Sequence, residues 1–372
     1  MLEKYDFFNM PKKYSLADYE SAISAIIKKY SKNEGLVSVY NWGDPSVYGI
    51  SDIDVLFVFR NNTKNALPFF SRSFNFLSSK ARYLIRHPFM FIDKNSFKNV
   101  KYIYPSANFR LLYGMDISIN KISSADSRYS NIALLNDIII RHYPRDFIEQ
   151  YVNKRINVRD TLLRLNSLKY SIKIFEDLAI KKNKEWGKKL ALVEDLRRNW
   201  LKKKDFDLLA SLNEHAVNMS IDIISIFKTF LIKNNLVKIN SGEKLAYNGM
   251  KNKSVFIKDW DKGKALREMI KIAANKKTFH SILPIELSAQ LAQYSKADGR
   301  ISSYIKDNIK GNISYQMKHE GIIKKRISML NSQAELAFKL MHSDFAAFFD
   351  FGYRNESGAN NWAISLIDRM RF

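Results

Sequence analysis

Two carboxylates spaced two residues apart are the first feature that could carry chemistry. Asp52 and Asp54 stand in the string Ser-Asp-Ile-Asp, where an apolar run over 53–59 reads as a strand buried on both faces. Side chains two apart leave the same face of a strand, so the two anions repel unless a cation lies between them. Oxygen-only ligands favour Mg²⁺ or Mn²⁺ over zinc. The pair therefore predicts a divalent metal site.

A glycine turn precedes the pair. Gly43 ends an expected strand over 36–42, and Ser46 opens a turn or helical start that returns at Gly49. Glycine lets the backbone approach a phosphate closely, and a helix N-terminus offers free N–H donors. This order predicts a triphosphate between residues 43–46 and a metal held by Asp52 and Asp54.

The first third of the chain alternates between helical and strand patterns. We expect a helix over 15–31 with Ser15 as its N-cap. The other expected elements are strands at 36–42, 53–59, 89–93 and 115–119 and a helix within 66–86. Alternating elements of this kind favour an α/β or α+β layer.

The remainder reads as helical from about residue 127. Three apolar stripes at three- and four-residue steps predict core-facing helices: Leu162, Leu165, Leu168, Ile172 and Phe175; Val217, Ile221, Ile224, Phe227 and Leu231; Ile323, Ile327, Leu330, Ala334 and Ala337. Residues 235–263 are richer in Gly, Asn and Lys, which indicates an irregular insertion or a boundary between two helical bundles. We therefore expect one domain over 1–126 and a helical domain over 127–372.

Trp42-Gly43 followed by Ser51-Asp52-Ile53-Asp54 resembles the nucleotidyltransferase superfamily, which includes DNA polymerase β, kanamycin nucleotidyltransferase and poly(A) polymerases. The resemblance covers roughly residues 15–125. It implies an α+β fold in which a small mixed-sheet nucleotidyltransferase core is followed by a larger, mostly α-helical domain. It also implies Mg²⁺-dependent transfer of a nucleoside monophosphate from NTP to an acceptor hydroxyl.

The resemblance implies a third carboxylate on a later strand, beside Asp52 and Asp54, as a metal ligand and the base for the acceptor proton. Asp93 ends the strand that follows the helix and is the favoured residue. Asp116, in Leu-Tyr-Gly-Met-Asp, is the rival. The remaining alternative has no third carboxylate and leaves an inactive nucleotide- or RNA-binding relative.

The resemblance also implies a nucleotide-binding set of Gly43, Asp44, Ser46, Ser51 and Lys169. Asp44 occupies a position that normally carries Ser or Gly, and an anion there opposes phosphate unless it points away. Ser46 is close enough to supply the missing hydroxyl.

Lys169 and Tyr170 fall on the helix after the core. Helical domains of the family often direct basic and hydroxyl side chains toward the triphosphate. A plain surface lysine is the alternative for Lys169.

The charge is strongly basic, with 61 Lys and Arg against 37 Asp and Glu and a net charge of +24. Of this excess, +6 lies in residues 1–126 and +18 in 127–372. Such an excess predicts a polyanionic partner, with RNA as one acceptor, unless a Lys-rich proteome alone explains it. Small-molecule and protein acceptors are the other options.

Residues 181–204 contain ten basic and three acidic residues around Trp186 and Trp200. The basic residues could neutralise phosphates and the indoles could stack on unpaired bases. A solvated helix with Leu190, Val193, Leu196 and Leu201 in the core is the other interpretation.

Several function classes are excluded by missing residues. Cys is absent, which excludes disulfides, zinc ribbons and thiol nucleophiles and fits a reducing compartment. We see no signal-peptide core and no transmembrane segment of about 20 apolar residues, so we expect a soluble cytoplasmic protein. No Walker loop or GxSxG string occurs, and the six His show no metal-ligand spacing, so we interpret them as structural.

Overall fold

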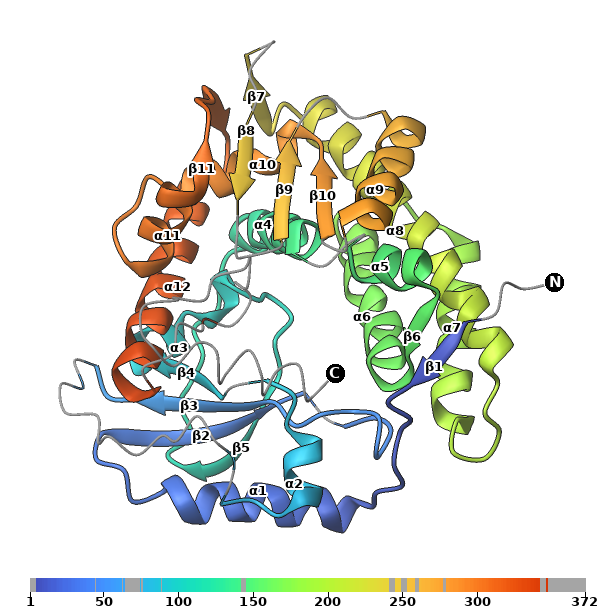
Figure 1. Ribbon diagram of the computed structural model, residues 1–372. Coiled ribbons are helices and arrows are strands. Elements are labelled where there is room, and N and C mark those ends of the chain that lie inside the picture. The colour runs from blue at the N-terminus through green and yellow to red at the C-terminus, as the bar shows by residue number, and fades with distance from the viewer. Residues whose placement is uncertain are drawn as a thin grey trace.

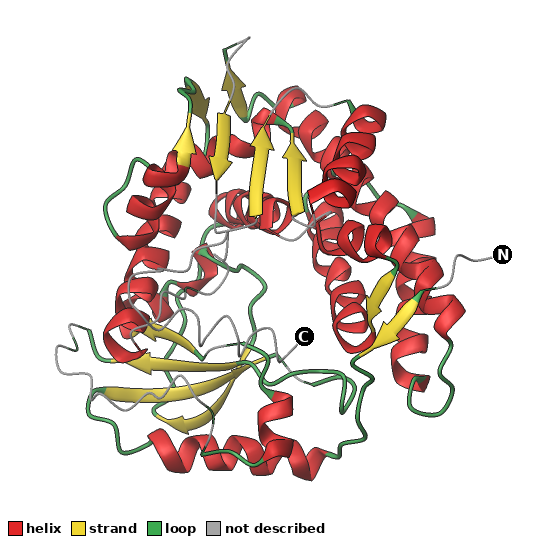
Figure 2. Cartoon of the chain, in the orientation of Figure 1, coloured by secondary structure: helices red, strands yellow, loops and turns green. Residues whose placement is uncertain are grey.

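The computed structural model describes residues 5–43, 45–61, 63, 74, 76–87, 89–141, 145–240, 245–248, 253–257, 261–276, 279–341 and 346. The fold is α+β, as expected, with a four-stranded mixed sheet at one end and helices over most of the rest (Figures 1 and 2). A second four-stranded sheet and two two-stranded sheets accompany it among these residues.

The four-stranded sheet at this end has the strand order β4-β3-β2-β5. Its strands are β2 (Leu36–Trp42), β3 (Val55–Phe59), β4 (Met90–Asp93) and β5 (Phe109–Gly114). β2 is antiparallel to both β3 and β5, whereas β3 and β4 are parallel. The N-terminal ends of β3 and β4 therefore lie side by side at the same end of the sheet. The Asp52–Asp54 segment lies at this end.

Helices cover both faces of the sheet. On one face lie α1 (Leu16–Tyr30) and α2 (Ser79–Leu84), with Tyr19, Ile26 and Tyr30 packed against the inner strands. On the other face lie α3 (Lys94–Lys98) and the 3₁₀ turn η1 (Val100–Tyr102). All five residues of β3 are buried, which confirms the expectation from their unbroken apolar run. Ser15 caps α1 through a reciprocal capping box with Asp18.

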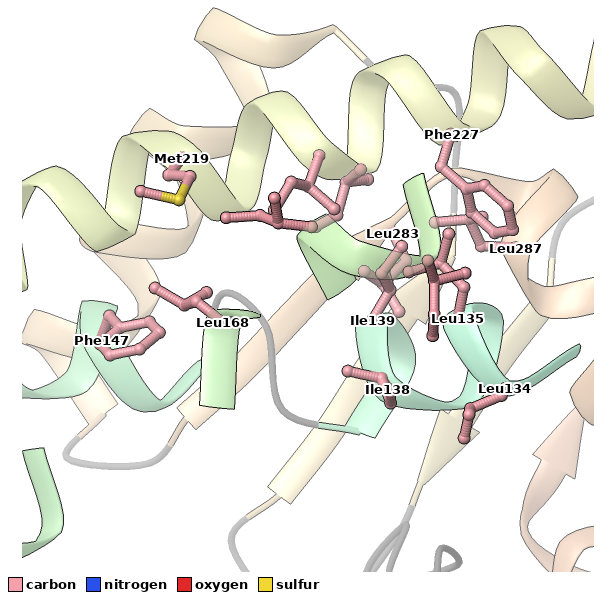
Figure 3. Close-up of a cluster of buried hydrophobic side chains, with 14 of the residues drawn as sticks. Leu134, Leu135, Ile138, Ile139, Phe147, Leu168, Met219, Phe227, Leu283 and Leu287 are labelled. Carbon is pink, nitrogen blue, oxygen red and sulfur yellow. The ribbon is translucent and has the colours of Figure 1, made fainter. Parts of the chain in front are cut away.

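A large hydrophobic core joins the helices of the second region (Figure 3). They are α4 (Ser124–Arg141), α5 (Arg145–Asn153), α6 (Val158–Asp177), α7 (Lys184–Asn199), α8 (Phe206–Lys233), α9 (Lys262–Lys276), α10 (Ile285–Tyr294), α11 (Arg300–Asn308) and α12 (Glu320–Met341). Every residue of the three expected stripes is buried, on α6, α8 and α12, which confirms them as core positions.

Two elements cross the division expected near residue 126. β1 (Asp6–Phe8) pairs in parallel with β6 (Arg155–Asn157). At the other end of the chain, Leu336, Ala337 and Leu340 of α12 enter the core beneath the sheet. Sheet and helices therefore share hydrophobic contacts drawn from both ends of the sequence.

A buried arginine holds the two regions together. Arg326 of α12 is fully buried, and its guanidinium donates to the Tyr102 and Ile103 carbonyls and, at 2.6 Å, to the Asp137 carboxylate. Removing one partner of such a pair costs about 3–5 kcal/mol, because an unpaired charge remains buried. Arg326 thus fixes η1 against α4 and α12.

Three expected elements differ in the structure. The strand expected at 115–119 is wrong, because β5 ends at Gly114 and no strand follows before α4. The irregular insertion expected at 235–263 contains β7 (Val237–Ile239), β8 (Leu245–Asn248) and β9 (Lys253–Ile257). β8 and β9 pair with each other in antiparallel orientation. All three strands also pair with later segments, namely β10 (Phe279–Leu283), β11 (Ile309–Lys310) and β12 (Tyr315–Met317). Much of the helix expected within 66–86 lies outside the described residues, and α2 is its described part.

α8 is long and apolar enough to cross a membrane by length and composition, and no other described helix is. Half of its most apolar window is buried inside the fold. The core helix of a soluble protein meets the same criteria, so α8 is weak evidence for a membrane span.

Candidate metal centre

Asp52 and Asp54 lie in the extended segment that leads into β3, just before the strand rather than on it. Two backbone hydrogen bonds fix this segment. The Trp42 N–H donates to the Asp54 carbonyl at 2.9 Å, and the Ile53 N–H donates to the Leu84 carbonyl at 2.9 Å. Buried Ile53 between the two acids directs their side chains to the opposite side. The carboxylates therefore converge, as the sequence predicted.

His87 completes a three-residue group with the two acids. Its Nε2 contacts the Asp54 Oδ1, and one donor atom from each of Asp52, Asp54 and His87 lies within 4.8 Å of the others. Three potential ligands at this spacing can hold a metal ion. The parallel pairing of β3 and β4 causes the arrangement, because His87 precedes β4 at the same edge where Asp54 precedes β3.

From the sequence, His87 was interpreted as a structural residue, like the other five histidines. The only available signal was its position just before the apolar run that forms β4, parallel to the strand that follows the Asp pair.

The electrostatic environment of Asp52 is unusual. Burial, together with the charge of Asp54, raises the pKa of the Asp52 carboxyl, while His87 and Arg86 act in the opposite direction. Arg86 itself forms an ion pair with Asp160 of α6, a residue that is only 5% exposed. The neighbouring arginine is thus bound to another acid, and the Asp52–Asp54 pair retains the mutual repulsion that a divalent ion would relieve.

Two buried arginines from the helical region face the same segment. Arg197 of α7 donates from Nη2 to the Ser51 Oγ at 3.5 Å, and Arg159 of α6 donates to the Tyr83 carbonyl at 2.6 Å. Both interact electrostatically with Asp52. Within the part of the chain that the structure describes, Arg197 Nε and Arg159 Nη2 are buried and have no hydrogen-bond partner. The centre therefore has positive charge on its helical side with unused N–H donors.

Tyr170 and Lys169 of α6 lie near these groups. Burial and the charges of Asp54 and Asp52 raise the pKa of the Tyr170 hydroxyl, while Arg197 acts in the opposite direction. Lys169 is exposed, and its ammonium donates to the Asn166 side chain at 3.2 Å. Desolvation and the adjacent Arg197 lower the pKa of Lys169. The structure thus brings Tyr170 to the acids and Lys169 to Arg197.

The expected phosphate-binding segment forms a turn without a helix. Gly43 has φ +78°, and open space lies where a Cβ would stand. Ser46 is exposed, whereas Ser51 is buried and its Oγ accepts from the Val47 N–H at 3.2 Å. Asp44 lies outside the described residues. Of this set, Gly43 follows Trp42, whose N–H donates to the Asp54 carbonyl. Ser51 accepts hydrogen bonds from the turn at Val47 and from Arg197.

Gly49 closes the same turn at φ +85°, where an added Cβ would stand 1.9 Å from the Lys12 carbonyl oxygen. Its N–H donates to the Tyr19 hydroxyl at 3.0 Å, and its carbonyl accepts from the Tyr83 hydroxyl at 2.9 Å. Glycine is required there by both conformation and space. These bonds make the turn a fixed support for Asp52.

Asp93, expected as the third metal ligand, does not join the pair. It pairs in register with Phe59, five residues beyond Asp54, which is about 16 Å along a strand. Its carboxylate caps α3 by accepting from the Ser96 N–H at 2.9 Å, and it also accepts from the Ser332 hydroxyl at 2.7 Å. The strand was predicted well, but the acid lies at its other end.

Asp116, the rival third acid, is also distant from the pair. It follows Gly114, which pairs with Ser38 of β2, and Ser38 in turn pairs with Val58 near the far end of β3. Asp116 is exposed and accepts from the Tyr40 hydroxyl at 3.2 Å. Neither acid proposed from the sequence completes the centre in this arrangement.

The basic segment 181–204 forms α7 and its flanks. Trp186 is 6% exposed and Trp200 is fully buried, so neither indole is available to stack on bases. Val193 and Leu196 are buried as expected, whereas Leu201 is 39% exposed. Lys202, Lys203 and Lys204 are exposed beyond the helix. The segment offers charge to a polyanion but no aromatic platform.

Comparisons with models of protein families, with curated proteins and with solved structures found no match to this chain.

Proposed function

We propose that this protein transfers a nucleoside monophosphate from an NTP to an acceptor hydroxyl with a divalent metal ion. The observation that carries the proposal is the convergence of Asp52, Asp54 and His87 within 4.8 Å beside the Gly43 turn. Two adjacent carboxylates can bind a divalent ion that also binds the phosphates of a nucleotide. The resemblance of the motif to nucleotidyltransferases supports the same chemistry.

The residues present fit such an ion. Asp52, Asp54 and His87 would hold it, and the ion would neutralise charge at the α-phosphate and on the departing pyrophosphate. The acceptor oxygen forms a bond to the α-phosphorus as the α–β phosphoanhydride bond breaks. A carboxylate oxygen of the centre takes the acceptor proton.

The helical side of the centre would bind the phosphates. Arg197 and Arg159 interact electrostatically with Asp52, and Lys169 interacts with Arg197. Guanidinium groups match phosphate oxygens in charge and geometry. Gly43, with open space on its Cα, would allow the backbone to approach the nucleotide.

We propose RNA as the acceptor class because of the basic helical region. The net charge of residues 127–372 is +18, and Lys202, Lys203 and Lys204 are exposed after α7. The α7 helix, which these lysines follow, also carries Arg197, whose side chain reaches Ser51 beside the centre.

Incubation of the full chain with each α-labelled NTP and either Mg²⁺ or Mn²⁺, with and without bulk RNA, tests the proposed function. We expect label in RNA together with stoichiometric pyrophosphate. Labelling of the protein or of a small molecule would replace RNA as the acceptor. Nucleotide or RNA binding without pyrophosphate release would contradict the proposed activity and leave a binding protein.

The acceptor proposal has its own test at the end of α7. Replacing Lys202, Lys203 and Lys204 with Gln should weaken RNA binding and reduce the salt slope of log Kd by about 2, at ~0.7 per lost contact to a single strand. The matched control replaces Lys28, Lys29 and Lys32, which are equally exposed at the end of α1. Equal losses of RNA affinity in both variants would show that RNA binds through overall charge, and this result would contradict a defined RNA-binding surface at the end of α7.

A further inference from the structure

We propose that the ion of this centre is Mn²⁺ rather than Mg²⁺, because the third potential ligand beside the two aspartates is a histidine nitrogen. The inference rests on the proposed function for the role of the metal. It depends on His87, a residue that the motif resemblance does not include.

The geometry allows one ion to contact all three side chains. Ligand atoms about 2.1 Å from a six-coordinate ion stand roughly 3–4 Å from each other. The donor atoms of Asp52, Asp54 and His87 already lie within 4.8 Å of one another, and their side chains are half-buried. Small rotations about side-chain bonds would therefore bring all three donor atoms to one ion. The remaining coordination positions of that ion would be open to phosphate oxygens and water.

The ligand chemistry selects among divalent ions. Mg²⁺ prefers oxygen ligands and retains its waters, whereas imidazole nitrogen binds first-row transition metals more strongly. Two carboxylates and the phosphates of a nucleotide are oxygen donors that also suit Mn²⁺. One nitrogen among several oxygens thus favours Mn²⁺ while keeping the octahedral geometry that nucleotide chemistry uses.

A different role for His87 makes the opposite prediction. An imidazolium paired with Asp54 would neutralise the acids and repel a cation. Removing it would then increase metal affinity, whereas removing a ligand decreases it. The sign of the change in Mn²⁺ affinity therefore distinguishes the two roles.

The experiment is a titration of the full chain with Mn²⁺ in the absence of nucleotide. Binding is monitored by electron paramagnetic resonance, and Mg²⁺ is added as competitor. We expect wild-type protein to bind Mn²⁺ more tightly than Mg²⁺. His87→Asn should weaken Mn²⁺ binding by at least ~10-fold, since the loss of outer partners alone costs 10–100-fold. His87→Asp should reduce the difference in affinity between Mn²⁺ and Mg²⁺, because it replaces the nitrogen ligand with an oxygen ligand.

His215→Asn is the matched control, because His215 lies exposed on α8 with its Nδ1 against the Ser211 carbonyl. It should leave both affinities unchanged. Equal affinity of wild-type protein for Mg²⁺ and Mn²⁺, or tighter Mn²⁺ binding by His87→Asn, would overturn the inference. The wild-type comparison stands even where a variant fails to fold.

The outcome is separable from that of the proposed function. Mn²⁺-selective binding that depends on His87, without turnover of any NTP, would support the inference and contradict the activity. Turnover that is equally fast with Mg²⁺ and indifferent to His87→Asp would support the activity and contradict the inference.

Discussion

The two ends of the β4-β3-β2-β5 sheet use aspartates in different ways. At the end where β3 and β4 begin, Asp52 and Asp54 converge on His87. At the end where β4 and β5 finish, Asp93 and Asp116 accept hydrogen bonds from serine and tyrosine groups of the protein. Asp93 and Asp116 thus connect parts of the fold to one another. Asp52 and Asp54 lie beside each other instead, and a cation between them would relieve their repulsion.

The largest expected effect is the loss of activity when the converging pair is neutralised. Asp52→Asn with Asp54→Asn removes the charges that would hold the ion, which supplies several kcal/mol of transition-state stabilisation. We expect turnover to fall about 10³-fold or more. The labelled-NTP assay measures this loss.

The same double variant should retain or raise the melting temperature, because the substitutions relieve repulsion between half-buried acids. Thermal unfolding without metal checks this. A large loss of stability would mean that the pair is structural, and the contrast between the sheet ends would fail.

A smaller effect, on stability, is expected at Asp93. Asp93→Ala removes the cap of α3 and the bond to Ser332 of α12. A lost cap and hydrogen bond cost about 1–2 kcal/mol in free energy of unfolding. Urea unfolding measures this cost. Turnover of the folded variant should be unchanged; a loss comparable to that of the Asp52–Asp54 variant would return Asp93 to the metal shell.

The smallest effect is expected at Asp116. Asp116→Asn retains an acceptor for the Tyr40 hydroxyl at an exposed position, so stability should change by less than about 0.5 kcal/mol. Metal binding and turnover should equal those of the wild type. This variant is therefore a control for the loss of a carboxylate outside the centre, and any marked fall in Mn²⁺ affinity would place Asp116 at the centre.

The sequence predicted α1, the buried stripes of α6, α8 and α12, and the strands β2, β3 and β4 because their patterns are local. The stripe on α6 and the apolar run of β3 each define a buried surface by themselves. The convergence of Asp52 and Asp54 was equally local. The α+β class followed from these elements.

The rest of the centre depends on contacts between distant residues. His87 reaches Asp54 only because β4 pairs in parallel with β3, and Arg197 reaches Ser51 from 146 positions away. Asp93 was chosen for its place at a strand end, but strand direction decides which end meets the pair. The strands β8 and β9 pair with each other, and their outer partners β11 and β10 come from later segments that the local pattern does not reveal.

The most direct measurement is the anomalous diffraction of crystals of the full chain soaked with Mn²⁺. The account predicts a peak between the side chains of Asp52, Asp54 and His87. A peak at Asp93 or Asp116 instead, or none at saturating Mn²⁺ with the His87–Asp54 contact intact, would contradict it.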